Sequence, residues 1–306
     1  GPCISELPHV LETYQKFHDK GFEIVGISFD QDKGALEKLT KAGLPVLIAP
    51  GTHDASGYRR SVYRRMRLPE GTHLFLTPTL EPGPRHTIRG ETVQTYGISF
   101  DGSVCPRPLA EFRTESLADY HLGVAHGALQ DSPTWKIRPQ DMPLTRQEIG
   151  ACGLHYLALG HFHNFAEVRD GGCVAVYPGT LEGKKFGENG PRFLVVATLG
   201  KEAVSIERTP WNARTVTEAV VDFQLAEIRE ARQLEERVAA FAGDREIVRV
   251  RLTGPAEFVF DPERLAARLA PKFFHLELDD RTYLVNARLL ERYREEGGRI
   301  QWLCLS

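Results

Sequence analysis

The chain has 306 residues, of which 42% are hydrophobic and 26% charged, and a formal net charge of −3. This composition is ordinary for a globular protein of about two domains, and it argues against nucleic-acid binding by bulk charge while leaving a local basic patch open. No stretch approaches the roughly 18 apolar residues of a membrane span, so we expect a cytoplasmic protein that does not enter the membrane. The five cysteines are odd in number and widely spaced, which indicates free thiols rather than a disulfide framework or a zinc site.

The N-terminal part of the chain predicts a β-α-β unit. A helix over residues 4–20 is followed by an apolar strand over 22–29, a helix over 32–43 and a second apolar strand over 44–50. Because such a crossover is right-handed and joins parallel strands, we expect the two strands to be neighbours.

The next segment, "GYRRSVYRRMR" over residues 57–67, predicts a basic helix. Arg59, Arg60 and Arg64 could contact phosphates, and Tyr58 and Tyr63 between them could stack on bases, which would suit a strand of DNA. A helix face that is merely solvated is the alternative.

Apolar strands dominate the middle of the chain. They are predicted over residues 72–77, 92–100, 120–127, 155–160, 173–179, 192–200 and 203–211, with a helix over 145–153 and a hairpin turn at Gly200 and Lys201.

Beyond Trp211 strands and helices alternate, which marks a second, small α+β domain. Strands are predicted over residues 215–223, 245–254 and 273–279, and helices over 225–243, 261–270 and 286–297.

Histidines follow the carboxyl ends of three predicted strands. Thr52, His53 and Asp54 follow the strand over 44–50, while His126 ends the strand over 120–127. In "YLALGHFHNF", His161 and His163 follow the strand over 155–160. Any one of these histidines could be structural. If the strands lie side by side, however, the imidazoles meet at one edge, and neutral imidazole is a common ligand of divalent metals.

Taken together, these segments resemble the calcineurin-like metallophosphoesterases, most closely the DNA-repair exonucleases of the Mre11/SbcD type. The resemblance covers residues from about 42 to the end. "PVLIAPGTHD" matches the family's G-N-H-D/E motif, "GVAHG" its single-histidine motif and "YLALGHFHNF" its G-H-x-H motif. "VYPGTLEGKKFGE" matches the Y-P-G…F-G-E segment that follows in these nucleases.

The resemblance implies an α/β fold, a metallophosphoesterase-type αββα sandwich with a small α+β capping domain, and a phosphodiester clamped by two divalent ions, of which Mn²⁺ is the usual one. His126 and His161 would bind one ion and His163 the other. His53 would help to neutralise the leaving group, and Asp54 would orient His53.

Two departures from the family pattern concern the metal ligands. Thr52 stands where the family has an asparagine, and a hydroxyl is a poorer donor than an amide oxygen. The family's D-x-H and G-D-x-x-D motifs, which supply most ligands of the other ion and the bridging carboxylate, are absent, so we expect the sandwich to be incomplete at its N-terminus.

Residues 1–40 instead resemble a fragment of a thioredoxin-like protein of the TlpA or peroxiredoxin type, on the strength of "GPCISELP" and "KGFEIVGISFDQD". Cys3 would be the second cysteine of a C-G-P-C motif, and a lone cysteine cannot cycle as a dithiol. Asp30 or Asp32 would lie close to the place of the bridging aspartate, or would be a solvated residue at a strand end. We interpret the chain as a fusion or a mis-joined gene product.

Three parts are therefore predicted: a thioredoxin-like fragment over 1–40, a metallophosphoesterase domain over 41–210 and a capping domain over 211–306. The expected function is a metal-dependent phosphodiesterase or DNA exonuclease subunit. By the same resemblance, its partners would be DNA, an SMC-like ATPase of the Rad50/SbcC type and a second copy of the chain. The alternatives are a catalytically inactive binding subunit of an ATPase complex and a thiol-disulfide redox protein.

Overall fold

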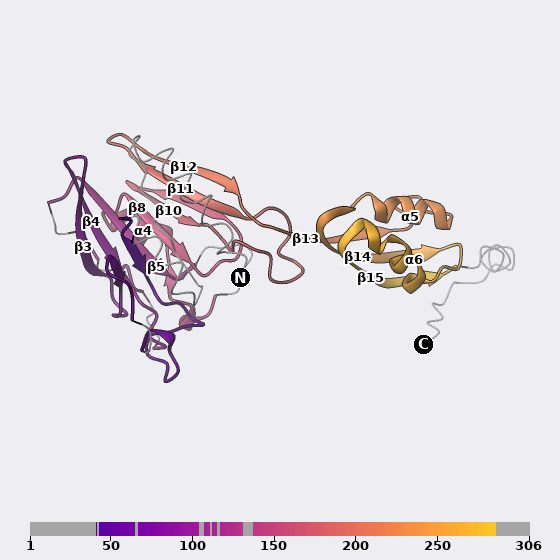
Figure 1. Ribbon diagram of the computed structural model, residues 1–306, viewed down its shortest axis with the longest axis horizontal. Coiled ribbons are helices and arrows are strands. Elements are labelled where there is room, and N and C mark those ends of the chain that lie inside the picture. Colours follow the sequence, from indigo (N-terminus) through magenta and orange to yellow (C-terminus); the bar gives the residue numbers. More distant parts are fainter. Residues whose placement is uncertain are drawn as a thin grey trace, which may run out of the picture. The chain divides into compact units, whose positions relative to one another are not determined.

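The computed structural model describes residues 41, 43–64, 67–103, 107–110, 112–114, 117–130 and 137–285. The β-α-β unit and the helix predicted over 286–297 therefore fall outside the described residues, apart from the strand over 44–50. The chain divides into two compact units (Figure 1). The first unit comprises Gly1–Leu181 and Arg192–Trp211, and the second unit comprises Glu182–Pro191 and Asn212–Ser306.

The first unit is built on a 6-stranded sheet with the order β3-β4-β5-β8-β10-β9. Its four inner strands run parallel, and the two outer strands, β3 and β9, are antiparallel to their neighbours. In chain order the strands are β3 (Glu81–Ile88), β4 (Glu91–Gly97), β5 (Tyr120–His126), β8 (Tyr156–Gly160), β9 (Ala166–Asp170) and β10 (Cys173–Tyr177).

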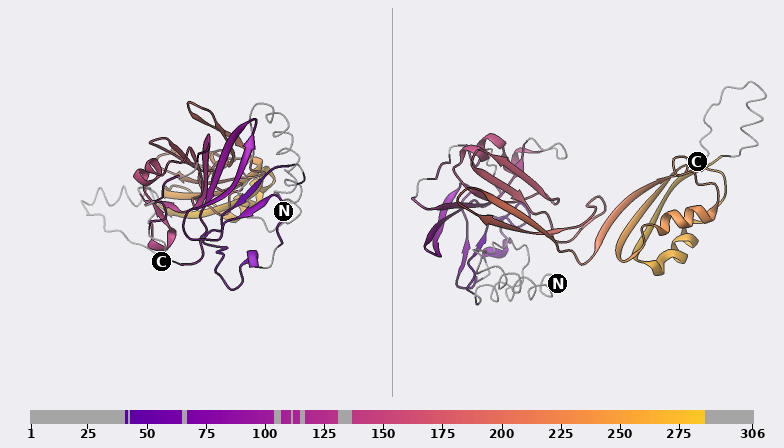
Figure 2. Two further views of the ribbon diagram at one scale, coloured as in Figure 1. Left: turned by 90° about the vertical axis from the view of Figure 1, so that its left-hand side faces the viewer. Right: turned by 90° about the horizontal axis from the view of Figure 1, so that it is seen from above.

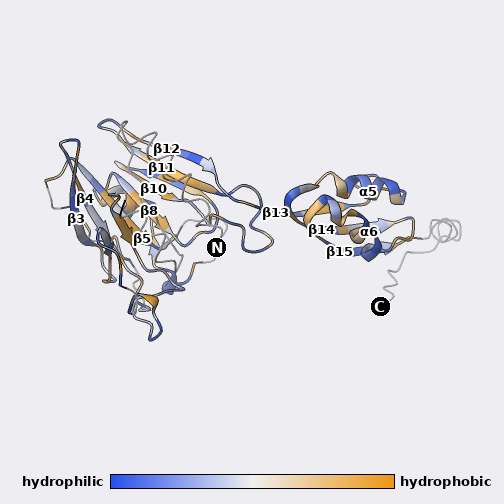
Figure 3. Ribbon diagram, in the orientation of Figure 1, coloured by the Kyte–Doolittle hydropathy of each residue, from blue (hydrophilic) through white to orange (hydrophobic). Residues whose placement is uncertain are grey.

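Strands β5, β8 and β10 are mostly apolar and buried along nearly their whole length because both faces of the sheet are covered (Figure 3). Successive side chains of β8 point to opposite faces, so Leu157 and Leu159 enter one hydrophobic cluster while Tyr156 and Ala158 enter another.

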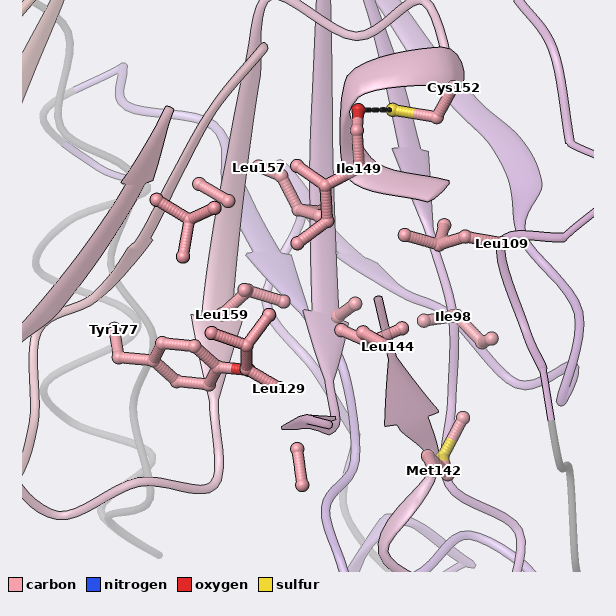
Figure 4. Packing of buried hydrophobic residues seen from close by; sticks show 14 of the residues in the cluster. Ile98, Leu109, Leu129, Met142, Leu144, Ile149, Cys152, Leu157, Leu159 and Tyr177 are labelled. Carbon is pink, nitrogen blue, oxygen red and sulfur yellow. Dashed lines mark hydrogen bonds between the residues drawn. The ribbon is translucent and has the colours of Figure 1, made fainter. Parts of the chain in front are cut away.

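One face of the sheet packs against the short helix α4 (Arg146–Ala151). Figure 4 shows Ile149 of α4 beside Leu157, and the Sγ of Cys152 donates a hydrogen bond to the carbonyl of Ile149 at 3.0 Å. Cys152 and Cys173 are both buried free thiols, as their spacing predicts.

The opposite face packs against the hairpin of β11 (Phe193–Leu199) and β12 (Val204–Pro210), which lies over the sheet in Figure 2. The pair is antiparallel, and the amide of Gly200 donates to the carbonyl of Ala203 at 3.0 Å, which confirms the hairpin predicted at this turn. Leu47, from the separate parallel pair of β1 (Val46–Ile48) and β2 (Thr72–Leu74), enters the same cluster.

The remaining elements of the first unit are small. They are the 3-10 turns η2 (Val62–Arg64) and η3 (Pro139–Asp141) and the parallel pair of β6 (Ala128–Leu129) and β7 (Pro143–Leu144).

The second unit holds a 3-stranded parallel sheet with the order β13-β14-β15. Its elements are β13 (Thr215–Asp222), α5 (Ala231–Ala239), β14 (Gly243–Ala256), α6 (Pro262–Leu269), the 3-10 turn η4 (Ala270–Lys272) and β15 (Phe273–Leu284). Both helices are crossovers on one face of this sheet (Figure 2), and they bury Leu234 and Leu265 against Val250 and Leu252. The strand-helix alternation predicted after Trp211 is confirmed as far as β15, although α5 is shorter than the helix predicted over 225–243.

The other face of this sheet carries paired charges. Glu218 of β13, Arg249 of β14 and Glu277 of β15 are direct cross-strand neighbours, and the Nε of Arg249 lies 2.9 Å from Oε1 of Glu277. Two residues further along β14 and β15, on the same face, Arg251 pairs with Asp279, and the Nε of Arg251 lies 2.9 Å from Oδ2 of Asp279.

The sequence prediction of a basic helix over 57–67 is wrong, because the described part of this segment forms turns and the single 3-10 turn η2. Its backbone is held by tertiary contacts instead. The amide of Ser56 bonds the carbonyl of Phe100 at 3.1 Å, and a Cβ on Gly57 would meet the carbonyl oxygen of Asp101.

The described residues form a mixed, sheet-rich α/β architecture with few helices, which is compatible with the expected metallophosphoesterase-type fold. In the part of the chain that is described, no helix is long and apolar enough to cross a membrane.

Candidate metal centre

The site is built at the carboxyl ends of β1, β5 and β8. Because β5 and β8 are parallel neighbours, His126 at the end of β5 pairs with Gly160 at the end of β8 and lies beside His161. The segment that follows β1 also lies beside His126, since the backbone amide of Thr52 donates a hydrogen bond to Nε2 of His126 at 3.3 Å. The predicted convergence of three strand ends is therefore present for Thr52, His126 and His161.

Three side-chain donor atoms meet at this point. Nδ1 of His161 lies 3.2 Å from Nε2 of His126, and Oγ1 of Thr52 lies 3.3 Å from the same nitrogen. Two nitrogens that each lie about 2.1 Å from one ion are about 3.0 Å apart at a right angle and about 3.4 Å apart at the tetrahedral angle. The separation of 3.2 Å falls between these values, so the spacing of the two nitrogens suits ligands of a single ion.

His126 is held in a tight, buried position. Its side chain is only 6% exposed, and a Cβ on Gly51 would lie 2.6 Å from its Nδ1, so only glycine leaves room for the ring. Burial, followed by the charges of His161 and His53, lowers the pKa of His126 to about 3, with Asp141 acting the other way. A neutral imidazole is the form that binds a metal.

His161 adopts an unusual backbone conformation, with φ at 119°. L-residues rarely occupy this region, and such strain costs on the order of 1–3 kcal/mol. The conformation turns the chain directly after β8 and points Nδ1 of His161 at Nε2 of His126. Burial lowers the pKa of His161 as well, and the nearby charge of Asp141 opposes this shift.

His163, two residues further on, is half-buried and close enough to His161 for its charge to lower the pKa of that residue. Its carbonyl accepts hydrogen bonds from Nη1 of Arg192 at 2.7 Å and from the amide of Thr180 at 3.0 Å. The role of the His163 imidazole as a metal ligand stays a prediction.

The predicted catalytic pair, His53 and Asp54, lies in the turn after β1. His53 is exposed, and its charge contributes to lowering the pKa of both His126 and His161, so it lies in the same region. The Asp54 carboxylate accepts bonds from the amide of Gly51 at 2.7 Å and from the hydroxyl of Tyr63 at 2.5 Å. These bonds brace the turn, and the orienting role of Asp54 toward His53 stays a prediction.

Tyr58 and Tyr63 connect the basic segment to the site. The Tyr58 hydroxyl donates to the carbonyl of Thr52 at 3.2 Å, and burial followed by Asp54 raises the pKa of Tyr63, which keeps its phenol a donor. Arg64 donates to the carbonyl of Ser56 at 3.4 Å. Arg59 and Arg60 are exposed in the same turn region.

The sequence motifs missed one buried carboxylate near the imidazoles, that of Asp141. It is 5% exposed, and its oxygens accept from the backbone amide of Arg138 at 2.9 Å and from the Arg138 guanidinium at 3.1 Å. Burial raises the pKa of Asp141, but the bonds from Arg138 outweigh it and the net pKa is lowered. The turn η3 brings this residue in, because the carbonyl of Met142 accepts from the amide of Ala128, two residues beyond His126.

Within the described residues, no group of three or more His, Cys, Asp or Glu side chains is arranged to hold a metal ion. The described part of the site thus offers two imidazoles and the Thr52 hydroxyl to one ion. Asp30, Asp32 and Cys3 fall outside the described residues.

Comparison with known proteins gives a distant relative. No protein-family model matches the chain. The chain is 24% identical over 218 residues to the uncharacterized metallophosphoesterase YhaO of Bacillus subtilis (strain 168), an alignment that covers 67% of this chain and 52% of that protein. The chain thus spans about half the length of the curated relative it matches. The likeness agrees with the metallophosphoesterase resemblance that the histidine motifs carry.

Proposed function

We propose that this chain is a metal-dependent phosphodiesterase subunit that acts on DNA as a cytoplasmic repair exonuclease of the Mre11/SbcD type. The observation that supports the proposal is that Thr52 Oγ1 lies 3.3 Å and His161 Nδ1 3.2 Å from His126 Nε2, separations that suit ligands of a single divalent ion.

Each residue of the site has a part in this reaction. His126, His161 and the Thr52 hydroxyl would hold one divalent ion, with Mn²⁺ as the expected metal, and His163 would belong to the second ion. When bound, the ions would act as Lewis acids on the phosphoryl oxygens. As water forms the new P–O bond and the bond to the leaving oxygen breaks, the exposed His53 imidazole would donate a proton to that oxygen, and the braced turn of Gly51 to Asp54 would keep His53 in place.

Arg59 and Arg60 are proposed to contact phosphates of the DNA strand, since both guanidiniums are exposed near the turn that carries His53. The proposed protein partners are a Rad50/SbcC-type ATPase and a second copy of the chain.

One observation favours a second candidate, the inactive binding subunit. The described residues bring together side chains for one ion only, whereas a two-metal reaction needs further carboxylates. A chain with this site could bind one ion and its ATPase partner without hydrolysing a phosphodiester.

Two measurements separate these functions: Mn²⁺ binding by calorimetry, and Mn²⁺-dependent hydrolysis of bis(p-nitrophenyl) phosphate and of linear DNA. Binding of two ions, with activity lost in His126→Ala and His161→Ala, supports the nuclease. His121→Ala is the matched control, because His121 is 7% exposed on the same strand β5, near its opposite end.

One weakly bound ion without hydrolysis supports the binding subunit instead. Activity that disappears with Cys3→Ser and survives His126→Ala would contradict both and favour the redox protein.

A further inference from the structure

Arg192 is a buried cation next to the candidate metal centre. It immediately precedes β11, its exposed fraction is 3%, and no sequence motif marks it. Arginine is almost never fully buried unless its guanidinium is well bonded, since removing the charge from water is costly. The position of this side chain therefore calls for a specific role.

The guanidinium bonds the last residue of the G-H-x-H segment and the residue that follows it. Nη1 of Arg192 donates to the carbonyl of His163 at 2.7 Å and to Oδ1 of Asn164 at 2.8 Å. Hydrogen bonds from a charged donor are roughly twice as strong as neutral ones. One nitrogen thus fixes both a main-chain oxygen and the following side chain.

A second chain segment holds the same carbonyl from another side. The amide of Thr180 donates to it at 3.0 Å, and Gly179, with φ at 82°, comes so close that a Cβ there would lie 2.5 Å from the oxygen. The peptide after His163 is therefore fixed by Arg192 and by the backbone of residues 179–180 together.

Fixing this peptide matters because the neighbouring backbone is strained. His161 holds φ at 119°, and a strained conformation persists only where the surroundings determine it. If the peptide after His163 could rotate, the segment could relax and turn both imidazoles away from the centre. The direction of the His163 side chain is set by the same backbone.

We propose that Arg192 is a positioning residue: through the His163 carbonyl and the Asn164 side chain it holds the His163 imidazole in place to bind metal, without touching substrate. This rests on the proposed function, in which His163 is a metal ligand. Residues that orient metal ligands typically change metal affinity by about 10–100-fold when they are replaced.

The experiment measures Mn²⁺ affinity by calorimetry, and the absorption spectrum of the Co²⁺-loaded protein, for wild type, Arg192→Gln and Arg192→Lys. Arg169→Gln is the matched control, because Arg169 also donates from its guanidinium to a backbone carbonyl of the first unit, that of Val204 at 3.0 Å. We expect Arg192→Gln to weaken binding about 10–100-fold and to change the Co²⁺ spectrum, Arg192→Lys to recover part of the affinity, and Arg169→Gln to change neither.

A double-mutant cycle with His163→Ala tests the route of the effect. If Arg192 acts through His163, replacing Arg192 in the His163→Ala background weakens binding no further. Equal losses in both backgrounds, or wild-type affinity in Arg192→Gln, overturn this inference and leave the proposed function standing. Wild-type protein that binds no ion overturns both. If Arg192→Gln does not fold, Arg192→Lys measured against Arg169→Lys decides the question by the same readouts.

Discussion

At the scale of single residues, His161 combines an unfavourable backbone conformation with a position at the centre of the site. Its φ of 119° is a region that glycine enters without steric cost and that other residues avoid. Strain of this kind is found at functional sites, where geometry is maintained at the expense of stability.

Replacing His161 by glycine and by alanine separates the backbone from the side chain. Both variants lose the imidazole, but only glycine relieves the strain, so His161→Gly should be more stable than His161→Ala by on the order of 1 kcal/mol. Urea unfolding of the metal-free proteins measures the difference. Alanine equal to or more stable than glycine would contradict this account of the backbone.

His121 gives a pH prediction away from the metal centre. Burial, followed by the charges of His155 and Arg85, lowers the pKa of His121, and its Nδ1 lies 3.2 Å from the Tyr96 hydroxyl. In the unfolded chain this histidine takes up a proton near pH 6.5, whereas in the folded chain it takes one up only at lower pH. The free energy of unfolding therefore has its full value above about pH 6.5 and decreases as the pH falls below it.

We therefore expect the free energy of unfolding of His121→Gln to depend less on pH than that of wild type below about pH 6.5. Denaturant unfolding at several pH values measures this slope. An unchanged slope in His121→Gln would rule out this histidine as its source.

The sequence could predict some site residues and not others for a physical reason. Thr52, His126 and His161 follow apolar strands, and parallel strands bring their carboxyl ends together. Arg192 and Asp141 reach the site through a loop and a 3-10 turn, which leave no periodic pattern. Residues that support a ligand from a distant part of the chain are visible only once the contacts are known.

At the scale of elements, apolar runs predicted the inner strands well, whereas outer strands and turns were harder to predict. The outer strand β3 was missed because Pro82 and Pro84 interrupt its pattern, and proline is tolerated at a sheet edge. The basic segment was mistaken for a helix because its tertiary bonds, such as that from Tyr63 to Asp54, outweigh local propensity.

The helix α4 depends on a capping box that the sequence shows as "TRQE". The amide of Glu148 donates to Oγ1 of Thr145 at 3.1 Å, and the amide of Thr145 donates to Oε2 of Glu148 at 2.9 Å. Thr145→Ala should lower the free energy of unfolding by about 0.5–2 kcal/mol, measured by denaturant titration. The exposed neighbouring variant Arg146→Ala is the control, and an equal loss in both would argue against the cap.

At the scale of the whole molecule, the two units have separate hydrophobic cores. The first unit buries its core on both faces of the 6-stranded sheet, and the second unit buries Leu252 and Val250 under α5 and α6. Each core follows from its own strand pattern, which is why the sequence indicates two folding regions.

A cavity in the second core should leave the metal centre intact. Leu252 is fully buried, so Leu252→Ala should cost about 2–5 kcal/mol of stability in the second unit. Scanning calorimetry should show the loss, while Mn²⁺ affinity should equal that of wild type. A parallel fall in Mn²⁺ affinity would mean that the two units do not fold independently.

The charged face of the β13-β14-β15 sheet has a consequence for how the protein would respond to salt. Arg249 and Arg251 already face Glu277 and Asp279, so these guanidiniums carry little uncompensated charge. DNA lying on this face would displace few counterions, and the logarithm of its affinity would change little with the logarithm of ionic strength. A steep salt dependence of DNA binding would therefore have to come from arginines outside the second unit's sheet, such as the exposed Arg59 and Arg60.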